Sequence, residues 1–226
     1  MTMPDIPQLF DCAPLRELVL PFRRQSISLL VVKDPWSSLA VDACDPQHDV
    51  YWGELWPAAL AAADALLENA IALPPPGAGP ILEIGCGTGL VTLATAISGG
   101  ADVRVIAADR ELRALDLVLE NARRNGVGAQ VSTLQLNWQQ KYSGRHPLIL
   151  AADCLYAPDA CWQLAAFLRG ALDPEFPGAR AIVVDPGRWS AANFRFQARQ
   201  VGFKVEKYTR QIPFLAAQGP IREIPV

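Results

Sequence analysis

The residues best suited to chemistry lie in the stretch 81–89, where an apolar run carries an acid and then enters a glycine-rich turn. Glycines allow the main chain to turn sharply and to approach a ligand closely, since a Cβ atom would collide there. The apolar run from Leu90 onward can begin a helix whose free N–H groups point at that ligand. The pattern predicts a nucleoside-binding turn made of Gly85, Cys86, Gly87, Thr88 and Gly89.

The spacing of the glycines distinguishes between two cofactor classes. A dinucleotide-binding turn, G-x-G-x-x-G/A, would have Gly or Ala at position 90, but this chain has Leu90 there and its third glycine at 89. The spacing therefore favours S-adenosylmethionine over NAD. It disfavours the alternative of an NAD-dependent oxidoreductase.

Two acids accompany the turn. Glu83 lies inside an apolar strand, where a carboxylate needs donors or a cation. We expect it either to reach the methionine ammonium, directly or through water, or to brace the turn. Asp109 closes the next predicted strand, where a carboxylate can accept hydrogen bonds from both ribose hydroxyls. It can also cap the helix predicted over 110–125.

Aromatic residues occur at two further positions that suit a ligand. Asn137 and Trp138 follow the third strand and offer an edge and a face for adenine, although they also suit a turn and a core. Ahead of the first helix, residues 51–57 read Y-W-G-E-L-W-P. Aromatic faces attract sulfonium and ammonium cations, so this segment suits a methyl donor and an amine acceptor, with plain packing as the alternative. Its residues of interest are Tyr51, Trp52, Glu54 and Trp56.

Asp153 stands at the carboxyl end of the fourth predicted strand, within reach of a transferred methyl group. With Tyr156 it can hold a nucleophilic amine in line with the methyl–sulfur bond, and the amine must lose its proton before it attacks. Arg188 follows the fifth strand and can pin a carboxylate of substrate or protein, or lie exposed at a helix start. Cys86 and Cys154 have no neighbouring histidine in the sequence, which argues against covalent thiol catalysis.

An alternation of strands and helices must bring these residues together. Such alternation indicates an α/β fold with a mostly parallel sheet, whose ligands bind beyond the carboxyl ends of the strands. We expect the two N-terminal strands to form a hairpin, and the proline-rich stretch 74–80 to be a stiff connector. The predicted strands are 16–22, 26–33, 80–84, 103–108, 129–135, 147–152, 179–184, 202–209 and, at the C-terminus, 220–226. The predicted helices are 57–70, 89–98, 110–125, 159–170 and 190–200.

Composition narrows the function classes. The net charge of −3 and the pI near 5.4 argue against nucleic acid as a partner. No apolar run reaches the ~20 residues that span a bilayer, and residues 1–11 contain no Lys or Arg, so we expect neither a membrane protein nor a targeting peptide. Five cysteines without a C-x-x-C pair and two histidines predict no metal site and reduced, cytoplasmic thiols. We expect one domain over 51–226 with an N-terminal extension over 1–50.

Taken in order, the motifs resemble the seven-β-strand class of S-adenosylmethionine-dependent methyltransferases. More narrowly, they resemble the protein-lysine methyltransferase branch that includes the electron-transfer-flavoprotein β-subunit lysine methyltransferase and its bacterial relatives. The resemblance spans residues 50 to 205 or so. It rests on Y-W-x-x-x-W-P at 51–57, the glycine motif at 83–89, Asp109, Asn137-Trp138 where Asp is more common than Asn, D-x-x-Y at 153–156 and D-P-G-R at 185–188.

The resemblance implies a Rossmann-like, seven-stranded, mostly parallel sheet with helices on both faces and an antiparallel last strand. It implies methyl transfer to a lysine of a protein substrate, with an electron-transfer flavoprotein subunit as one candidate, by a monomer. A small-molecule, nicotinamide-like N-methyltransferase and a noncatalytic cofactor-binding protein are the alternatives. The expected catalytic residues are Asp153 and Tyr156, and the expected substrate residues are Tyr51, Trp52, Glu54 and Arg188. The expected S-adenosylmethionine-binding residues are Trp56, Glu83, Gly85, Cys86, Gly87, Thr88, Gly89, Asp109, Arg110, Asn137, Trp138 and Ala152.

Overall fold

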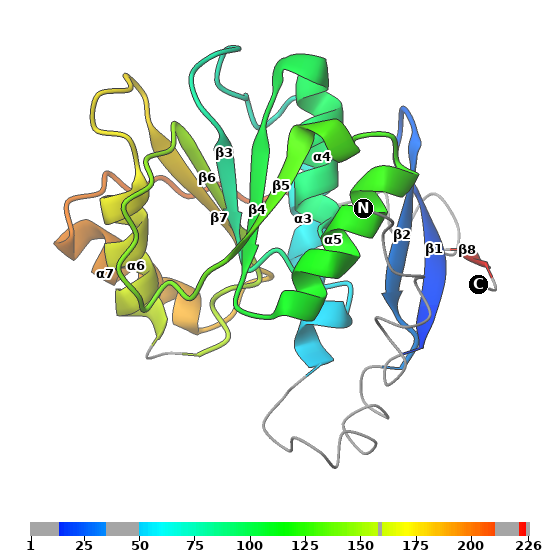
Figure 1. Ribbon diagram of the computed structural model, residues 1–226. Coiled ribbons are helices and arrows are strands. Elements are labelled where there is room, and N and C mark those ends of the chain that lie inside the picture. Colours follow the sequence, from blue (N-terminus) through cyan, green and yellow to red (C-terminus); the bar gives the residue numbers. More distant parts are fainter. Residues whose placement is uncertain (1–13, 35–49, 158–159, 211–221, 225–226) are drawn as a thin grey trace.

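The computed structural model of the chain describes residues 14–34, 50–157, 160–210 and 222–224. A five-stranded parallel sheet with the order β5-β4-β3-β6-β7 forms its centre (Figure 1). Because the strand order reverses at β3, the crevice beyond the carboxyl end of this strand is the place where open α/β sheets bind ligands. The strands are β3 (Ile81–Ile84), β4 (Val105–Asp109), β5 (Val131–Gln135), β6 (Leu148–Ala152) and β7 (Arg180–Val184).

Helices cover both faces of this sheet (Figure 1). One face is covered by α3 (Pro57–Leu67), α4 (Leu90–Gly99) and α5 (Leu112–Arg124), and the other by α6 (Ala160–Ala171) and α7 (Ser190–Gln200). Alternate side chains of the central strand enter the two cores, with Ile81 on the α4 side and Leu82 on the α6 side. Burial on both faces explains why the central strands are continuous apolar runs. Short 3₁₀ turns occur at η1 (Val50–Gly53), η2 (Gly100–Asp102) and η3 (Gly128–Gln130).

A second, antiparallel sheet packs beside α5 (Figure 1). It has the order β2-β1-β8 and consists of β1 (Leu15–Pro21), β2 (Ser26–Val32) and β8 (Arg222–Ile224). The side chain of Asn121 on α5 joins the two parts, because its Oδ1 accepts from the Leu30 N–H at 2.7 Å and its Nδ2 donates to the Leu30 carbonyl at 3.1 Å. The hairpin is therefore fastened to the helix that follows β4.

The α/β class, the mostly parallel sheet and the N-terminal hairpin predicted from the sequence are confirmed. The expected number of seven strands is wrong for the described residues, where the main sheet has five strands. The strand predicted over 202–209 is also wrong, since this segment is irregular. Its alternating pattern reflects partial burial of Phe203 and Val205 against the second core, with no neighbouring strand to pair with in the part of the chain that the structure describes. The C-terminal strand does form, at β8, but it pairs with β1 instead of the main sheet.

None of the helices within 14–34, 50–157 and 160–210 is both long and apolar enough to cross a lipid bilayer.

Candidate functional site

The residues singled out in the sequence gather at the carboxyl edge of the main sheet. Parallel pairing of β3 with β4 and β6, of β4 with β5, and of β6 with β7 aligns the five strand ends. The glycine turn follows β3, Asp109 ends β4, Trp138 follows β5, and Asp153 follows β6. Asp185 and Arg188 follow β7 at the same edge. The topology therefore brings together motifs that are more than 100 residues apart in the chain.

The glycine turn has no space for side chains. Gly85, Gly87 and Gly89 have φ angles of +64°, +49° and +82°, which L-residues with side chains rarely adopt. A Cβ on Gly85 would lie 2.8 Å from the Cys154 Sγ, and one on Gly89 would lie 2.7 Å from a methyl of Val118. Gly89 also forms the N-cap of α4. This backbone fits a nucleoside that contacts the main chain.

Asp109 is linked directly to the turn. Its Oδ2 accepts from the Gly87 N–H at 3.0 Å, and its Oδ1 accepts from the Glu111 N–H at 3.1 Å. Burial raises the pKa of this carboxyl, and the backbone donors at Gly87 and Glu111 counter part of that effect. The N-cap of α5 is Glu111, so Asp109 stands one turn ahead of the helix as a preoriented acceptor. A carboxylate oxygen accepts two hydrogen bonds, which leaves capacity for a ligand hydroxyl on each side.

Glu83 is fully buried on the α4 side of β3, with 1% of its surface exposed. The Thr92 hydroxyl on α4 donates to its Oε2. Burial raises the pKa of Glu83 to about 8, while the hydrogen bonds from Thr92 act in the opposite direction. The expectation that Glu83 accepts a hydrogen bond is confirmed, with Thr92 as the donor.

The segment after β5 places a ring beside the glycine turn. The Trp138 ring lies 3.7 Å from the position of a Cβ on Gly85, and it is partly buried against the second core. Asn137 accepts from the Gln139 N–H at 3.0 Å through its Oδ1, a local turn that leaves its amide nitrogen for other partners. The aromatic ring is thus next to the turn, as expected for an adenine-facing residue.

Three other residues expected to contact the cofactor are Cys86, Ala152 and Arg110. Cys86 is buried, its N–H donates to the Ala108 carbonyl at 3.1 Å, and burial raises the pKa of its thiol. Ala152 ends β6 and is partly buried. Arg110 forms an ion pair with Glu111 at 3.2 Å, with more than half of its side chain exposed. Burial thus disfavours the thiolate form of Cys86.

The aromatic segment 51–57 divides into a packed and an open part. The Trp52 ring is buried with Leu30, Val32, Ala114 and Leu117, so it joins the hairpin to α5. Its carbonyl oxygen would lie 3.1 Å from a Cβ on Gly87. Trp56 donates from its indole to the Tyr51 carbonyl at 2.9 Å, and the two ring centroids are 6.1 Å apart. Tyr51 is 43% exposed.

Glu54 carries a buried carboxylate oxygen, Oε2, that has no hydrogen-bond partner among the described residues. Burial raises the pKa of Glu54, and the nearby charge of Arg16 partly counters this. A carboxylate in this state favours a cation or a hydrogen-bond donor as its neighbour.

Asp153 and Arg188 form an ion pair through Oδ1 and Nη1. The second carboxylate oxygen of Asp153 accepts from the Ala58 N–H at 2.7 Å, in the first turn of α3. Arg188 also reaches Asp185 Oδ2 at 3.2 Å, so of the alternatives weighed for Arg188 the one in which it pins a protein carboxylate is found. Tyr156 is 59% exposed at the rim of this cluster.

Sequence reasoning missed two polar residues that hold the site. Thr92 is fully buried under Glu83, and Asn121 is fully buried and donates to the Thr88 carbonyl at 2.9 Å as well as binding β2. The available signal was a polar residue on the apolar face of a predicted helix, since Asn121 follows Leu117 and Val118 by one turn. A buried amide in such a place has to find partners.

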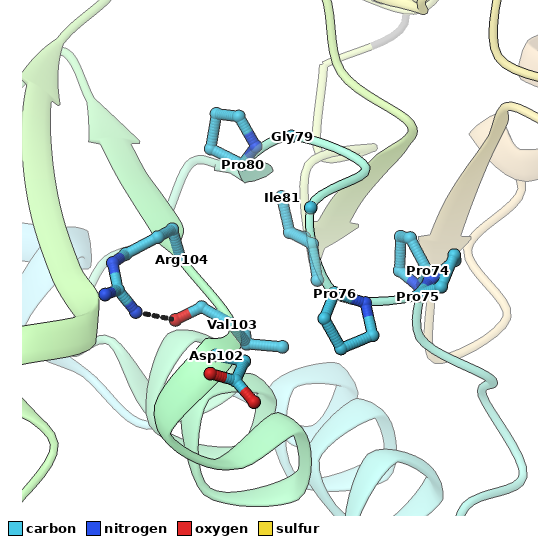
Figure 2. A pocket seen from close by; sticks show the side chains of 10 residues that line it. Pro74, Pro75, Pro76, Gly79, Pro80, Ile81, Asp102, Val103 and Arg104 are labelled. Carbon is cyan, nitrogen blue, oxygen red and sulfur yellow. Dashed lines mark hydrogen bonds between the residues drawn. The ribbon is translucent and has the colours of Figure 1, made fainter.

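Two surface hollows have linings that do not include residues 85–89, although the second shares Trp138 with the site. The first, of about 270 Å³, is lined by the proline connector, the start of β3 and the residues before β4 (Figure 2). It lies at the amino edge of the sheet, opposite the site, and Figure 2 shows Arg104 donating to the Val103 carbonyl there. The second, of about 300 Å³, is lined by Trp138, Gln139, Gln140, Tyr142, Trp162, Gln163, Ala166, Phe167 and Gly170.

The sequence model described as lysine methyltransferase matches residues 45–184, which is more than half of the chain and includes the glycine turn, Asp109 and Asp153. The chain belongs to this family. The lysine methyltransferase family match thus confirms the methyltransferase resemblance and S-adenosylmethionine as the cofactor. The glycine turn, in which a Cβ at Gly85 or Gly89 would collide, and the preoriented Asp109 acceptor fit a nucleoside of this kind.

The names of the curated relatives describe methyltransferases whose substrates are proteins. The chain is 31% identical over 135 residues to the release factor glutamine methyltransferase of Agrobacterium fabrum, covering 59% of this chain and 44% of that protein. It is 36% identical over 92 residues to the ribosomal protein L11 methyltransferase of Pelotomaculum thermopropionicum, covering 38% of this chain and 29% of that protein. The chain thus matches less than half the length of these relatives.

A solved structure supports the fold. The magnesium protoporphyrin IX methyltransferase of Synechocystis PCC 6803, determined with bound S-adenosylmethionine, superposes with a TM-score of 0.50 at 18% identity. The alignment covers 67% of this chain and 72% of that one. At this identity the likeness concerns the arrangement of helices and strands.

Proposed function

We propose that this chain transfers a methyl group from S-adenosylmethionine to the side-chain nitrogen of a lysine in a protein substrate. The observation that carries the proposal is the lysine methyltransferase family match over 45–184, which includes both the donor turn and the Asp153–Tyr156 motif. The names of the curated relatives support a protein substrate in general.

The donor would lie across the carboxyl ends of β3, β4 and β5. The turn 85–89 would contact it through main chain, since no side chain fits at the three glycines. Asp109 would accept from the ribose hydroxyls, and Trp138 with Asn137 would face the adenine. Glu83 would act on the methionine ammonium, directly or through water. Trp56, Cys86, Arg110 and Ala152 complete the proposed donor contacts.

On the acceptor side, the residues would orient an amine and keep water out. S-adenosylmethionine supplies a methyl group on a sulfonium, which needs an unprotonated nitrogen lone pair in line with the methyl–sulfur bond. A lysine ammonium first loses its proton to solvent, the new carbon–nitrogen bond then forms as the carbon–sulfur bond breaks, and the sulfur keeps the bonding electron pair. Asp153 and Tyr156 would hold the amine, and Tyr51, Trp52 and Glu54 would shape the approach.

The charges at this edge suit a cationic acceptor. Asp153 and Asp185 share a single arginine, and Glu54 adds a buried carboxylate oxygen without a described partner. Opposite charge near an amine substrate raises its local concentration and orients it. We propose an electron-transfer flavoprotein subunit as the first substrate to test, on the strength of the D-P-G-R segment, and a cytoplasmic monomer as the acting form.

Methylation of a glutamine amide is the second candidate, because the release factor glutamine methyltransferase is 31% identical over the matched region. An amide nitrogen has its lone pair delocalised into the carbonyl, so it needs more activation than an amine. The two candidates differ in the modified residue and can be separated by one measurement.

The test is incubation of the purified chain with S-adenosylmethionine carrying a deuterated methyl group, with an electron-transfer flavoprotein and separately with a cell extract. Peptide mass spectrometry should find the heavy methyl on lysine, and Asp153→Asn should lower its incorporation at least tenfold. Label on glutamine would establish the second candidate. Label only in small metabolites would indicate a small-molecule enzyme, and donor binding without any label would indicate a noncatalytic protein.

A further inference from the structure

Helix α3 begins without a side-chain cap of its own. Its N-cap residue is Trp56, which makes no capping hydrogen bond, and its first residue is Pro57, which has no N–H. The next amide, that of Ala58, donates to Asp153 Oδ2 at 2.7 Å. The acid that follows β6, 95 residues later, therefore caps this helix, and its charge is favourable at a helix N-terminus.

The backbone at Asp153 is held in a rarely populated conformation. Its φ is +59°, in the left-handed region, and its N–H donates to the Val184 carbonyl of β7 at 3.0 Å. Such strain persists only where the surroundings over-determine it, and it is concentrated at functional sites. The next residue, Cys154, lies against Gly85 of the cofactor turn. One two-residue corner thus touches the start of α3 on one side and the donor turn on the other.

Arg188, in the segment that follows β7, contacts this corner. Its Nη1 contacts Asp153 Oδ1 and lies 3.2 Å from Asp185 Oδ2. Asp185 is itself fixed by the Gly187 and Arg188 N–H groups, which donate to its Oδ1 at 2.8 and 2.6 Å. The side chains of Asp153 and Asp185 are 6% and 7% exposed, against 25% for Arg188, so solvent screens the pair only partly.

We propose that Arg188 is a positioning residue for methyl transfer: it fixes the Asp153 carboxylate between β7 and the start of α3, so that the remaining lone pairs of Asp153 meet the acceptor amine. This inference rests on the proposed function and goes beyond it by assigning Arg188 to orientation of an acid instead of substrate binding. A carboxylate oxygen accepts two hydrogen bonds, so a fixed Asp153 keeps capacity for the amine. Displacement of a group by about 1 Å can cost 10²-fold in rate.

The test compares Arg188→Met, Arg188→Lys and Arg199→Met, the last being an exposed arginine on α7 outside the network. Arg188→Met should lower kcat by about 30-fold or more, because the acid is no longer fixed. The KM for the protein substrate and the Kd for S-adenosylhomocysteine should stay within about threefold. Arg188→Lys should recover part of kcat, since lysine keeps the charge but not the forked geometry. Arg199→Met should match the wild type.

Hydrogen exchange supplies a readout that does not depend on turnover. Amides of residues 58–60 should exchange faster in Arg188→Met than in the wild type, with Arg188→Lys between them. A wild-type kcat in Arg188→Met, or a loss of S-adenosylhomocysteine affinity as large as the loss of kcat, would overturn the proposal. If Arg188→Met does not fold, Arg188→Lys takes its place in the test. A wild-type kcat together with wild-type amide exchange in Arg188→Lys would then overturn the proposal. Absence of lysine methylation by the wild type would instead refute the proposed function, while exchange still tests the link to α3.

Discussion

Glu83 is a carboxyl group removed from water at the centre of the sheet. Its described hydrogen-bond donors are neutral, namely the hydroxyl and the backbone N–H of Thr92. A neutral donor stabilises a carboxylate less than a cation does, so the protonated acid is favoured in the free protein. The pKa of about 8, raised mainly by burial, expresses this balance.

This residue should make stability depend on pH. The folded pKa of about 8 lies above the ordinary 4.5, so the folded state holds the proton more tightly than the unfolded state. The free energy of unfolding should be greatest below about pH 4.5 with respect to this group, and should fall by more than about 1 kcal/mol as the pH rises toward 8. Urea titrations at several pH values measure it. Glu83→Gln should flatten the dependence of the unfolding free energy on pH, and the exposed Glu206→Gln should not. Equal pH dependence in the wild type and both variants would contradict the assignment to Glu83.

A second residue-level prediction concerns Gly85. Gly85→Ala places a methyl group 2.8 Å from the Cys154 Sγ at a φ of +64°, so the turn has to move. S-adenosylhomocysteine affinity, measured by calorimetry, should drop at least about tenfold, which corresponds to about 1.4 kcal/mol. The matched change Gly170→Ala on α6 meets no atom within 4 Å and should leave affinity unchanged, with stability equal or about 0.5–1 kcal/mol higher. Unchanged affinity in Gly85→Ala would mean that the ligand does not use this turn.

At the scale of elements, α5 links the hairpin to the cofactor turn through one amide. The Asn121 side chain accepts from the Leu30 N–H on β2, and it donates to the Leu30 carbonyl and to the Thr88 carbonyl in the turn. Two elements far apart in the sequence thus share one buried side chain, which sets the distance between them.

Asn121→Ala should therefore affect two properties together. Three buried backbone groups lose their partner, so the free energy of unfolding should fall by about 3 kcal/mol. S-adenosylhomocysteine affinity should fall as well, because the Thr88 carbonyl loses its donor. Asn121→Asp keeps the acceptor for the Leu30 N–H but turns a buried carboxylate oxygen toward the Leu30 and Thr88 carbonyls, so it should destabilise the protein at least as much as alanine in chemical denaturation. A loss of stability with wild-type S-adenosylhomocysteine affinity would show that Asn121 does not couple the hairpin to the glycine turn.

Helices and strands were largely predictable because the spacing of apolar residues in the sequence matches the period of the helix or strand whose face they bury. The range 190–200 predicted for the last helix equals that of α7, and Glu83 and Asp109 fall within β3 and β4. The segment 202–209 has the same alternation as a strand but no partner strand among the described residues, and pairing is a property of the whole sheet that periodicity does not encode. The link from Asp153 to Ala58 was also invisible, since it depends on a helix start and a strand end meeting in space. Residue types predicted which groups do chemistry, whereas their mutual contacts required the fold.

At the scale of the whole molecule, the hairpin and the α/β core share polar contacts besides Asn121. Arg124 on α5 reaches Glu17 on β1 at 3.1 Å and Glu120 on its own helix at 2.9 Å. The Asn125 amide binds the backbone of Ser28 on β2. The buried Trp52 ring adds an apolar contact between the same parts.

These contacts predict that hairpin and core unfold together. Tryptophan fluorescence and far-ultraviolet circular dichroism should give coincident transitions in urea. Arg124→Met should lower the midpoints of both transitions equally, which corresponds to a loss of about 1 kcal/mol in the free energy of unfolding. The exposed Arg23→Met, whose ion pair with Glu68 is largely in solvent, should shift neither. Faster exchange of the β2 amides than of the β3 amides by several orders of magnitude would show that the hairpin opens independently.

The dependence of α3 on an acid from a distant strand affects how inactive variants are interpreted. An alanine at position 153 would remove a chemical group and, at the same time, the anchor of the first helix on that face of the sheet. A mutational scan would record both losses as one defect. Asparagine at this position keeps an oxygen for the helix amide but turns an NH2 group toward Arg188, so it separates the loss of the helix anchor from the loss of the charge and of the Arg188 contact.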